Sequence, residues 1–220
     1  MDVFLAQLPR FIDASWLTLW MFVVVSIIST ILGALLAIAA GGVGRWLSGP
    51  MAVYSWVFRG LPELVVLLAC YFALPMLGFD LGSVGAALLG FTLIGTAFLY
   101  EIARTGLAAI DPGLLQAARA LGMGWSLTMR RVILPQAIRV VVTPWATFLA
   151  GYVKAFALAS AISVAEVMMI TRQTMAISTQ PFFLILVAGG IYAAMASALM
   201  LLEYGLKRYL DRRYGTVGRA

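Results

Sequence analysis

Residues 111–136 read DPGLLQAARALGMGWSLTMRRVILPQ, and this stretch forms the centre of the only long polar interruption in the chain, from about residue 101 to residue 139. Its first half predicts a helix over residues 114–121, because Ala, Leu, Arg and Gln are all good helix formers. Asp111 supplies an acidic cap, and the proline that follows it suits the first turn of a helix. Gly122 is expected to end this helix.

A second short helix is predicted over residues 126–133. It should end before Pro135, because a proline disfavours the helical conformation of the residue that precedes it. We therefore expect two short helices that meet at a glycine corner and form a compact knob.

The sequence on both sides of this knob is strongly apolar. Of the 220 residues, 63% are hydrophobic and 11% are charged, and the mean hydropathy is +1.02. Soluble chains average about 45–50% apolar and about 25% charged residues, so we expect a membrane protein. The chain has no His and a single Cys, Cys70, which leaves no metal site, disulfide framework or Cys/His nucleophile. The net charge of +6 is interpreted as basic loops at a membrane surface and not as a nucleic-acid site.

Five stretches have the length of about 20 residues that a helix needs to cross a bilayer. The sequence therefore predicts an all-α membrane protein, one transmembrane domain over residues 1–220, with five transmembrane helices. The expected spans are Trp16–Ala40, Met51–Leu77, Val84–Tyr100, Val140–Val164 and Phe182–Leu202.

The basic residues give this arrangement a direction. Twelve of the fifteen Lys and Arg residues lie on one side of this arrangement: Arg45 and Arg59 between the first two spans or near the start of the second, five in the polar segment 101–139, and five in the tail after the last span. Cytoplasmic loops collect positive charge. The N-terminus is therefore expected outside and the C-terminus in the cytoplasm.

Two charged residues at the fourth span are candidate members of a substrate pathway, because a charge inside a bilayer must face a cavity, pair or reach the interface. Glu166, at the outer end of the span, suits the ammonium group of an amino acid; a solvated loop carboxylate is the equally weighted alternative. Lys154, within the span, suits a substrate carboxylate or a pair with a neighbouring Glu; a side chain that extends to the interface is the alternative.

The second span contains a third candidate, Glu63. Because Arg59 lies four residues earlier, an i, i+4 ion pair is the favoured interpretation of Glu63, and a pathway role is the alternative. Glu101 and Arg104, three residues apart, are expected to form another structural pair at the inner interface.

The polar segment also carries a recognisable motif. The motif resembles the cytoplasmic loop E-A-A-x3-G-x9-I-x-L-P of ABC importer permeases. In this chain the pattern begins with Gln116-Ala117-Ala118, continues with Gly122 after three intervening residues, and ends with Leu134-Pro135. Residues 100–107 and 134–139 resemble the polar amino-acid branch of that family. The stretch FRGLPEL, residues 58–64, is similar to the R-G-x-P-[DE]-L form of permeases for basic amino acids and opines.

The resemblance implies the type I ABC importer permease fold and a cytoplasmic segment, about 109–136, that couples the permease to an ATPase subunit. Two positions depart from the family pattern: Gln116 replaces the usual Glu, and the sequence KAFAL begins at Lys154 where many relatives have K-D-T-S-L. The residues that the resemblance assigns to the coupling loop are Leu114, Gln116, Ala117, Ala118, Leu121, Gly122, Leu134 and Pro135.

The resemblance also implies a function and a set of partners. The chain would translocate polar, in particular basic, amino acids or opines across the bacterial inner membrane, with a homologous second permease, two ABC ATPase subunits and a periplasmic binding protein. It contains no G-x4-G-K-[ST] phosphate loop, so it would bind no cofactor and catalyse no reaction, and ATP and Mg would lie on the partner ATPase.

Two other classes are weighed against this interpretation. A self-sufficient secondary carrier or channel is disfavoured, because five spans without an internal repeat differ from the paired halves of most carriers. A membrane-embedded enzyme is disfavoured by the absence of a His or Cys centre and of a clustered carboxylate pair.

Overall fold

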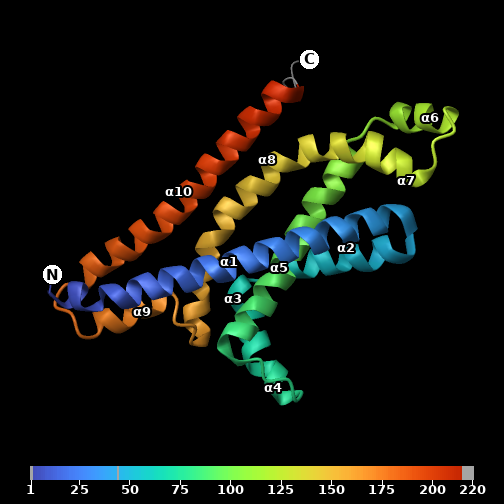
Figure 1. The fold of residues 1–220 in the computed structure, drawn as a ribbon. Coiled ribbons are helices and arrows are strands. Elements are labelled where there is room, and N and C mark those ends of the chain that lie inside the picture. Colours follow the sequence, from blue (N-terminus) through green and yellow to red (C-terminus); the bar gives the residue numbers. More distant parts are fainter. Residues whose placement is uncertain (1, 44, 215–220) are drawn as a thin grey trace.

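The computed structural model describes residues 2–43 and 45–214 and is all-helical over that part of the chain (Figure 1). The α-helices are α1 (Asp2–Val43), α2 (Arg45–Gly60), α3 (Glu63–Leu68), α4 (Leu74–Met76), α5 (Gly82–Ala108), α6 (Pro112–Ala120), α7 (Trp125–Thr128), α8 (Leu134–Tyr152), α9 (Val167–Met175) and α10 (Pro181–Tyr214). Two π-helical turns, η1 (Ala69–Ala73) and η2 (Met129–Ile133), and the 3-10 helix η3 (Val153–Ile162) lie between them.

Four helical segments of the described chain are long and apolar enough to cross a membrane: Val3–Gly41, Gly82–Ala108, Trp125–Ile162 and Pro181–Arg208. They contain the predicted first, third and fifth spans and most of the fourth, and each begins before its predicted span. The 42-residue helix α1 is about 63 Å long at 1.5 Å per residue, roughly twice the hydrocarbon thickness of a bilayer. It is therefore longer than an upright crossing of a bilayer requires.

The second predicted span is a bent pair of helices. The segments Trp46–Gly60 and Glu63–Met76 meet at 104°, and they count as a fifth crossing only if they act together. Pro62, with φ −58° and ψ 131°, has an extended conformation between them, and a proline cannot donate the hydrogen bond that would continue the helix. Before the bend, α2 lies beside α1 as an antiparallel hairpin (Figure 1).

The bend shows that the favoured interpretation of Glu63 is wrong. An i, i+4 pair requires one continuous helix, and here Arg59 lies in the last turn of α2 while Glu63 begins α3. Arg59 lies instead beside Glu101 of α5, with its Nη1 atom 3.9 Å from Oε2 of that residue.

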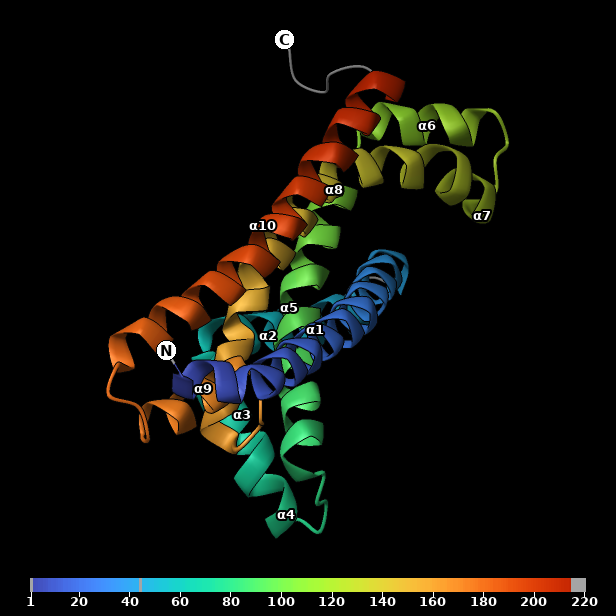
Figure 2. The ribbon, with the colours of Figure 1, turned by 60° about the vertical axis from the view of Figure 1, so that its left-hand side comes forward.

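Helices α1 and α5 cross at very short range. A Cβ atom at Gly33 would lie 2.7 Å from the backbone nitrogen of Tyr100 and 2.9 Å from the carbonyl carbon of Leu99. On the opposite helix, a Cβ atom at Gly95 would lie 2.7 Å from the hydroxyl oxygen of Ser29. Small residues at such positions allow membrane helices to approach closely, and this contact places α1 across the middle of the molecule (Figure 2).

An aromatic cluster joins α5 to α8 and η3. The rings of Phe91 and Phe156 stack with centroids 4.2 Å apart. The Tyr152 hydroxyl donates a hydrogen bond of 2.6 Å to the Phe91 carbonyl oxygen. All three side chains are buried, so the two halves of the chain share one core.

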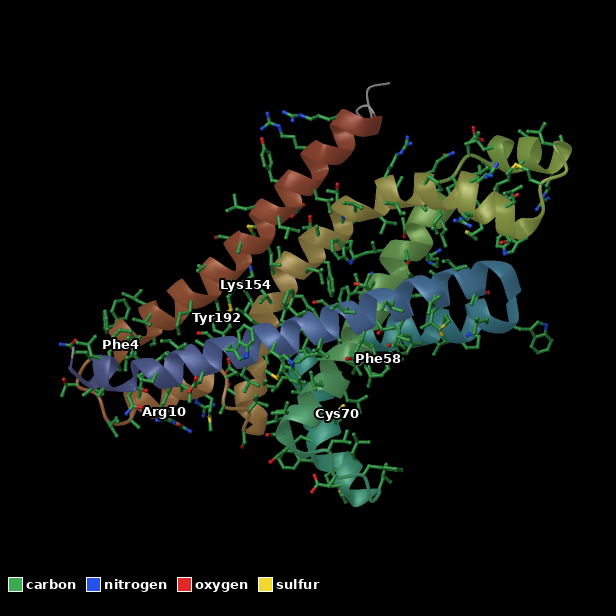
Figure 3. The ribbon with its side chains drawn as sticks, in the orientation of Figure 1. Phe4, Arg10, Phe58, Cys70, Lys154 and Tyr192 are labelled. Carbon is green, nitrogen blue, oxygen red and sulfur yellow. The ribbon has the colours of Figure 1, made fainter. Side chains whose placement is uncertain are left out.

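Further contacts attach the first turns of α1 to the last third of the chain (Figure 3). The rings of Phe4 and Phe183 pack edge to face, 5.7 Å apart, and the Arg10 guanidinium donates to the side-chain oxygen of Gln173 on α9. At the far end of the molecule, α6 and α7 lie near the C-terminal end of α10, whereas α4 lies at the opposite end (Figures 1 and 2).

We predict that Gly33→Ala lowers the free energy of unfolding of the protein by about 1–3 kcal/mol, the usual cost of overpacking. The reason is that the new methyl group would meet the backbone of α5. Gly41→Ala is the matched control on the same helix, since no atom lies within 4 Å of its Cβ position. The control should be neutral or slightly stabilising, as Ala favours helix over Gly by roughly 0.5–1 kcal/mol. Thermal unfolding of the two variants in detergent measures the difference, and equal melting temperatures would contradict the close contact.

Candidate coupling segment and membrane-embedded charges

The first half of the predicted coupling segment is the helix α6, with the cap expected from the sequence. The Asp111 side chain accepts a 2.8 Å hydrogen bond from the backbone N–H of Gly113. Pro112 occupies the first helical turn, where its missing N–H would have no intrahelical partner in any case. The beginning of α6 is therefore set by local sequence.

The end of α6 is a Schellman motif centred on Gly122. The backbone N–H of Gly122 bonds to the carbonyl of Arg119 at 2.9 Å, and that of Met123 bonds to the carbonyl of Ala118 at 3.0 Å. This motif places the central residue in the left-handed region, and Gly122 has φ +70°. The predicted glycine corner is confirmed, and the physical reason is the positive φ, which a Cβ atom makes costly.

A small apolar cluster attaches this segment to the ends of two long helices. Its buried members are Ile110, Ile133 and Ala137, with Leu115 of α6 and Met129 of η2 packed against them. Because the cluster joins the end of α5 to the start of α8, the segment is packed on both helices and does not hang from them as a free loop.

The outer surface of the segment is apolar and exposed. Leu114 is 39% exposed and Leu121 is 80% exposed, and Gln116 and Ala117 of the motif are exposed as well. Ala118, in contrast, is only 3% exposed. Its small size is explained by packing within the chain, whereas Ala117 lies on the surface open to a partner.

The predicted second helix of the segment does not end before Pro135, so that boundary was wrong. Helix α7 passes through the π-helical turn η2 directly into α8, which begins at Leu134. Pro135 lies in the first turn of α8, where a proline is tolerated. Leu134 and Pro135 are both exposed.

Glu166 is fully buried, at 0% exposure, so the alternative of a solvated loop carboxylate is wrong. One of its carboxylate oxygens accepts a 2.9 Å hydrogen bond from the Met169 backbone N–H and caps α9. The other accepts a hydrogen bond from the Tyr192 hydroxyl of α10 (Figure 3).

The backbone just before Glu166 has an uncommon conformation. Ser163, which ends η3, has φ +65° and is the one non-glycine residue with positive φ in the described part of the chain. The Val164 N–H bonds to the Ala159 carbonyl at 3.2 Å, as in the glycine corner of the coupling segment. This turn directs the chain into α9.

The other two candidates lie apart from Glu166. Lys154, in the first turn of η3, is exposed (Figure 3), and Glu63 at the start of α3 is half-buried. Over residues 2–43 and 45–214, no hydrogen bond or ion pair joins any two of Glu63, Lys154 and Glu166.

A different group of charges is brought together by α2 and α5. The expected pair of Glu101 and Arg104 is confirmed: Arg104 Nε donates to Glu101 Oε2 at 3.1 Å, and a second guanidinium nitrogen bonds to Oε1. Arg59 joins this pair across the helices, with its guanidinium carbon 5.5 Å from the ring centroid of Phe98. Sequence spacing identified the pair but not Arg59, which is separated from it by more than forty residues.

No group of three or more Cys, Asp or Glu side chains able to hold a metal ion occurs in the described part of the chain. The charged side chains described above form acid–base pairs and a buried helix cap. Together with the apolar helices and the packed segment at one end, they define the class of the protein as a helical membrane protein.

Comparison with known proteins identifies the family. Residues 29–216 match the family described as binding-protein-dependent transport system inner membrane component, and the chain belongs to this family. The arginine transport system permease protein ArtQ of Bacillus subtilis is 31% identical over 205 residues, which cover 93% of this chain and 94% of the relative. The octopine transport system permease protein OccM of Rhizobium meliloti is 32% identical over 81% of this chain and 78% of the relative.

Other matches cover less of the relative. The probable amino-acid ABC transporter permease protein YckA of Bacillus subtilis is 37% identical over 139 residues, which cover 63% of this chain and 62% of the relative. The arginine transport system permease protein ArgU of Corynebacterium glutamicum matches over 84% of this chain and 63% of its own length.

Solved structures support the same fold, that of type I ABC importer permeases. A crystal structure of an amino acid ABC transporter with histidines superimposes with a TM-score of 0.86 at 27% identity, over 94% of this chain and 96% of that one. The permease fold of an inward-facing MetNI methionine ABC transporter matches with a TM-score of 0.76 at 21% identity, over 93% and 98% of the two chains.

We predict that Glu166→Ala destabilises the protein by about 2 kcal/mol or more, because it removes a helix cap and leaves the Tyr192 hydroxyl without its acceptor. Glu166→Gln should cost less, since its amide oxygen can still accept from the Met169 N–H. Thermal unfolding of the purified protein tests both variants. If Gln costs as much as Ala, the charge of Glu166 and not its acceptor atoms is what stabilises the fold.

Proposed function

We propose that this chain is the membrane-spanning subunit of an ATP-driven importer for polar amino acids, with basic amino acids or opines as the expected cargo. The proposal is supported above all by the packed segment of α6 and α7, which combines a capped helix, a glycine corner and an exposed apolar surface in a chain of the binding-protein-dependent family. The named transport roles of ArtQ, ArgU and OccM favour this cargo class.

In this proposal the whole chain is one transmembrane permease domain, and residues 109–136 couple it to the ATPase. The contact with a cleft in the ATPase subunit would be made by four exposed residues: Leu114, Gln116, Ala117 and Leu121. Gly122 would form the turn that follows them. Gln116 in place of Glu keeps a polar side chain at this contact but gives up an ion pair. ATP and Mg would be bound by the partner.

The proposed orientation follows from charge. The N-terminus would be outside and the coupling segment and C-terminus inside, as the distribution of Lys and Arg indicates. Five crossings, with the bent pair as one, would agree with this orientation, and α6, α7 and the end of α10 then share the cytoplasmic side.

The mechanism is a shift between two arrangements of the helices. Closure of two ATPase subunits would stabilise the outward-facing arrangement, and hydrolysis would return the inward-facing one. A segment packed against both α5 and α8 suits this role, because it transmits displacement to two spans at once. A second, homologous permease subunit would complete the pathway, and a periplasmic binding protein would deliver the cargo.

A self-sufficient secondary carrier or channel remains the alternative function. It would use neither the exposed apolar surface of α6 nor the glycine corner. Uptake by proteoliposomes separates the two functions.

Uptake is best measured with this chain, its ATPase, its sister permease and its binding protein in vesicles, against a panel of labelled amino acids and octopine. We expect uptake of one or more of these compounds only with ATP supplied on the ATPase side. The matched control is the same vesicle with a non-hydrolysable ATP analogue. Uptake by this chain alone, without ATP, would establish the carrier instead.

The coupling role is tested at Gly122. Gly122→Val places a β-branched residue at φ +70°, a conformation such residues avoid, and we expect it to abolish substrate-stimulated ATPase activity while membrane insertion persists. Gly124→Val is the matched control, because Gly124 has an ordinary extended backbone, φ −67° and ψ 160°, and open space around its Cβ position. Normal stimulated activity in the Gly122 variant would count against the coupling role.

A further inference from the structure

We infer that an anionic phospholipid binds in the groove where α1, α5 and α8 meet beside the coupling segment. One acyl chain would lie in the groove, and the phosphate would bind to Arg130 and Arg131. This inference goes beyond the proposed function, because it assigns a ligand that is not transported. It takes from that function only the orientation that places the coupling segment at the inner surface of the membrane.

The groove is apolar throughout. It encloses a cavity of about 100 Å3, and every residue that lines it is Ala, Val, Leu or Ile. The small side chains of Ala34 on α1 and Ala103 on α5 leave room between the helices, and Leu134 and Ile138 of α8 are exposed along it. Apolar cavities stay free of water and accept apolar ligands, so the expected occupant is a hydrocarbon group.

The groove adjoins the apolar cluster that holds the coupling segment in place. Ala137 lines the groove and is buried in that cluster together with Ile110 and Ile133. Leu107 also lines the groove and packs against the same cluster. An acyl chain in the groove would therefore complete the packing at the point where the coupling segment joins α5 and α8.

Two arginines lie at one end of the groove. Arg130 and Arg131 precede Leu134 by four and three residues, so they lie about one turn before it on the same side of the helix. Both side chains are exposed, and in the described part of the chain neither forms a hydrogen bond or an ion pair. Guanidinium groups without a protein acceptor suit a phosphate, which they bind through charge-assisted hydrogen bonds.

The order of side chains along this part of the chain matches the boundary of a membrane. Trp125, the first residue of α7, is exposed, and tryptophan is enriched where a membrane meets water. The two arginines follow within six residues, and the exposed apolar residues Leu134 and Ile138 come after them. We therefore place the arginines at the level of the lipid phosphates and the groove at the level of the acyl chains.

Charge favours a lipid over another protein as the occupant. Residues 101–139 contain five arginines and two carboxylates. Of these carboxylates, Glu101 is bonded to Arg104 and Asp111 caps α6. A second copy of this chain would bring the same basic surface to the contact, and like charges repel. An anionic headgroup is complementary, and basic pockets between membrane helices on the cytoplasmic side bind such headgroups.

The first test needs no substitution. The protein is placed in phosphatidylcholine nanodiscs with a trace of phosphatidylglycerol that carries a photoreactive diazirine in one acyl chain, and mass spectrometry locates the labelled residues. We expect labels within residues 134–141 and 103–107. Unlabelled phosphatidylglycerol should displace the probe several-fold better than added phosphatidylcholine.

Three results would overturn the site. The first is an absence of labels in these two ranges, as expected if a second protein chain covers the groove. The second is equal displacement of the probe by the two lipids. The third is equally effective displacement by inorganic phosphate, which would indicate a site for free phosphate.

The groove itself is tested by filling it. Ala34→Leu should reduce labelling of residues 134–141 several-fold, because the larger side chain would occupy the space of the acyl chain. Ala194→Leu, at an exposed alanine of α10 outside the groove, is the matched control and should keep the labelling. Unchanged labelling in the Ala34 variant would overturn the site, and the displacement test still decides the question if that variant does not fold.

The headgroup contact is tested by replacing both arginines. The double variant Arg130→Gln and Arg131→Gln should lower the preference for phosphatidylglycerol over phosphatidylcholine several-fold. Arg208→Gln, at an exposed arginine of α10, is the matched control and should retain the preference. A preference unchanged in the double variant would overturn the assigned contact. These measurements need neither ATP nor cargo, so their failure would leave the proposed function intact.

Discussion

The architecture depends on the close contact between α1 and α5, where Gly33 lies against the backbone of Tyr100 and Gly95 lies against the side chain of Ser29. In a bilayer, helices gain little from the hydrophobic effect when they associate, so van der Waals contact and interhelical hydrogen bonds must hold them together. Helix α5 also packs against α8 through its aromatic residues and brings the pair of Glu101 and Arg104 beside α2. The position of α5 relative to α1 therefore determines where the aromatic core, this charged pair and the coupling segment lie.

The coupling segment and the membrane core are connected through packing and not through a flexible tether. Ile110, two residues after the end of α5, and Ile133, just before α8, belong to the same buried cluster. A displacement of the exposed leucines of α6 would therefore move the end of α5 and the start of α8 together. The Schellman motif at Gly122 removes the freedom that a plain loop would have, since both of its backbone bonds must break before the corner can open.

Local features of the fold were predictable from sequence, whereas features that depend on distant contacts were not. The Asp111 cap, the Gly122 corner and the pair of Glu101 and Arg104 follow from residues within one or two helical turns of each other. The bend after Gly60 was missed because the apolar composition continues through it, although Gly60 and Pro62 were visible signals. The partners of Arg59 and Glu166 lie on other helices, and no spacing along the chain indicates that Tyr192 would meet a carboxylate twenty-six residues earlier.

The cap at Glu166 has a mechanical consequence. The Glu166 carboxylate accepts hydrogen bonds from the first turn of α9 and from Tyr192 of α10, so it holds these two helices together. Helix α10 has 34 residues and is about 51 Å long. Towards its C-terminal end, Glu203 accepts a 2.9 Å hydrogen bond from the Thr147 hydroxyl of α8, and α10 could pivot about this contact. Tyr192 lies eleven residues before Glu203 on α10, so a rotation of α10 by about 5° about that point would move Tyr192 sideways by roughly 1.4 Å. Because the Glu166 carboxylate bonds to both helices, a movement of α10 about this point would displace α9 as well.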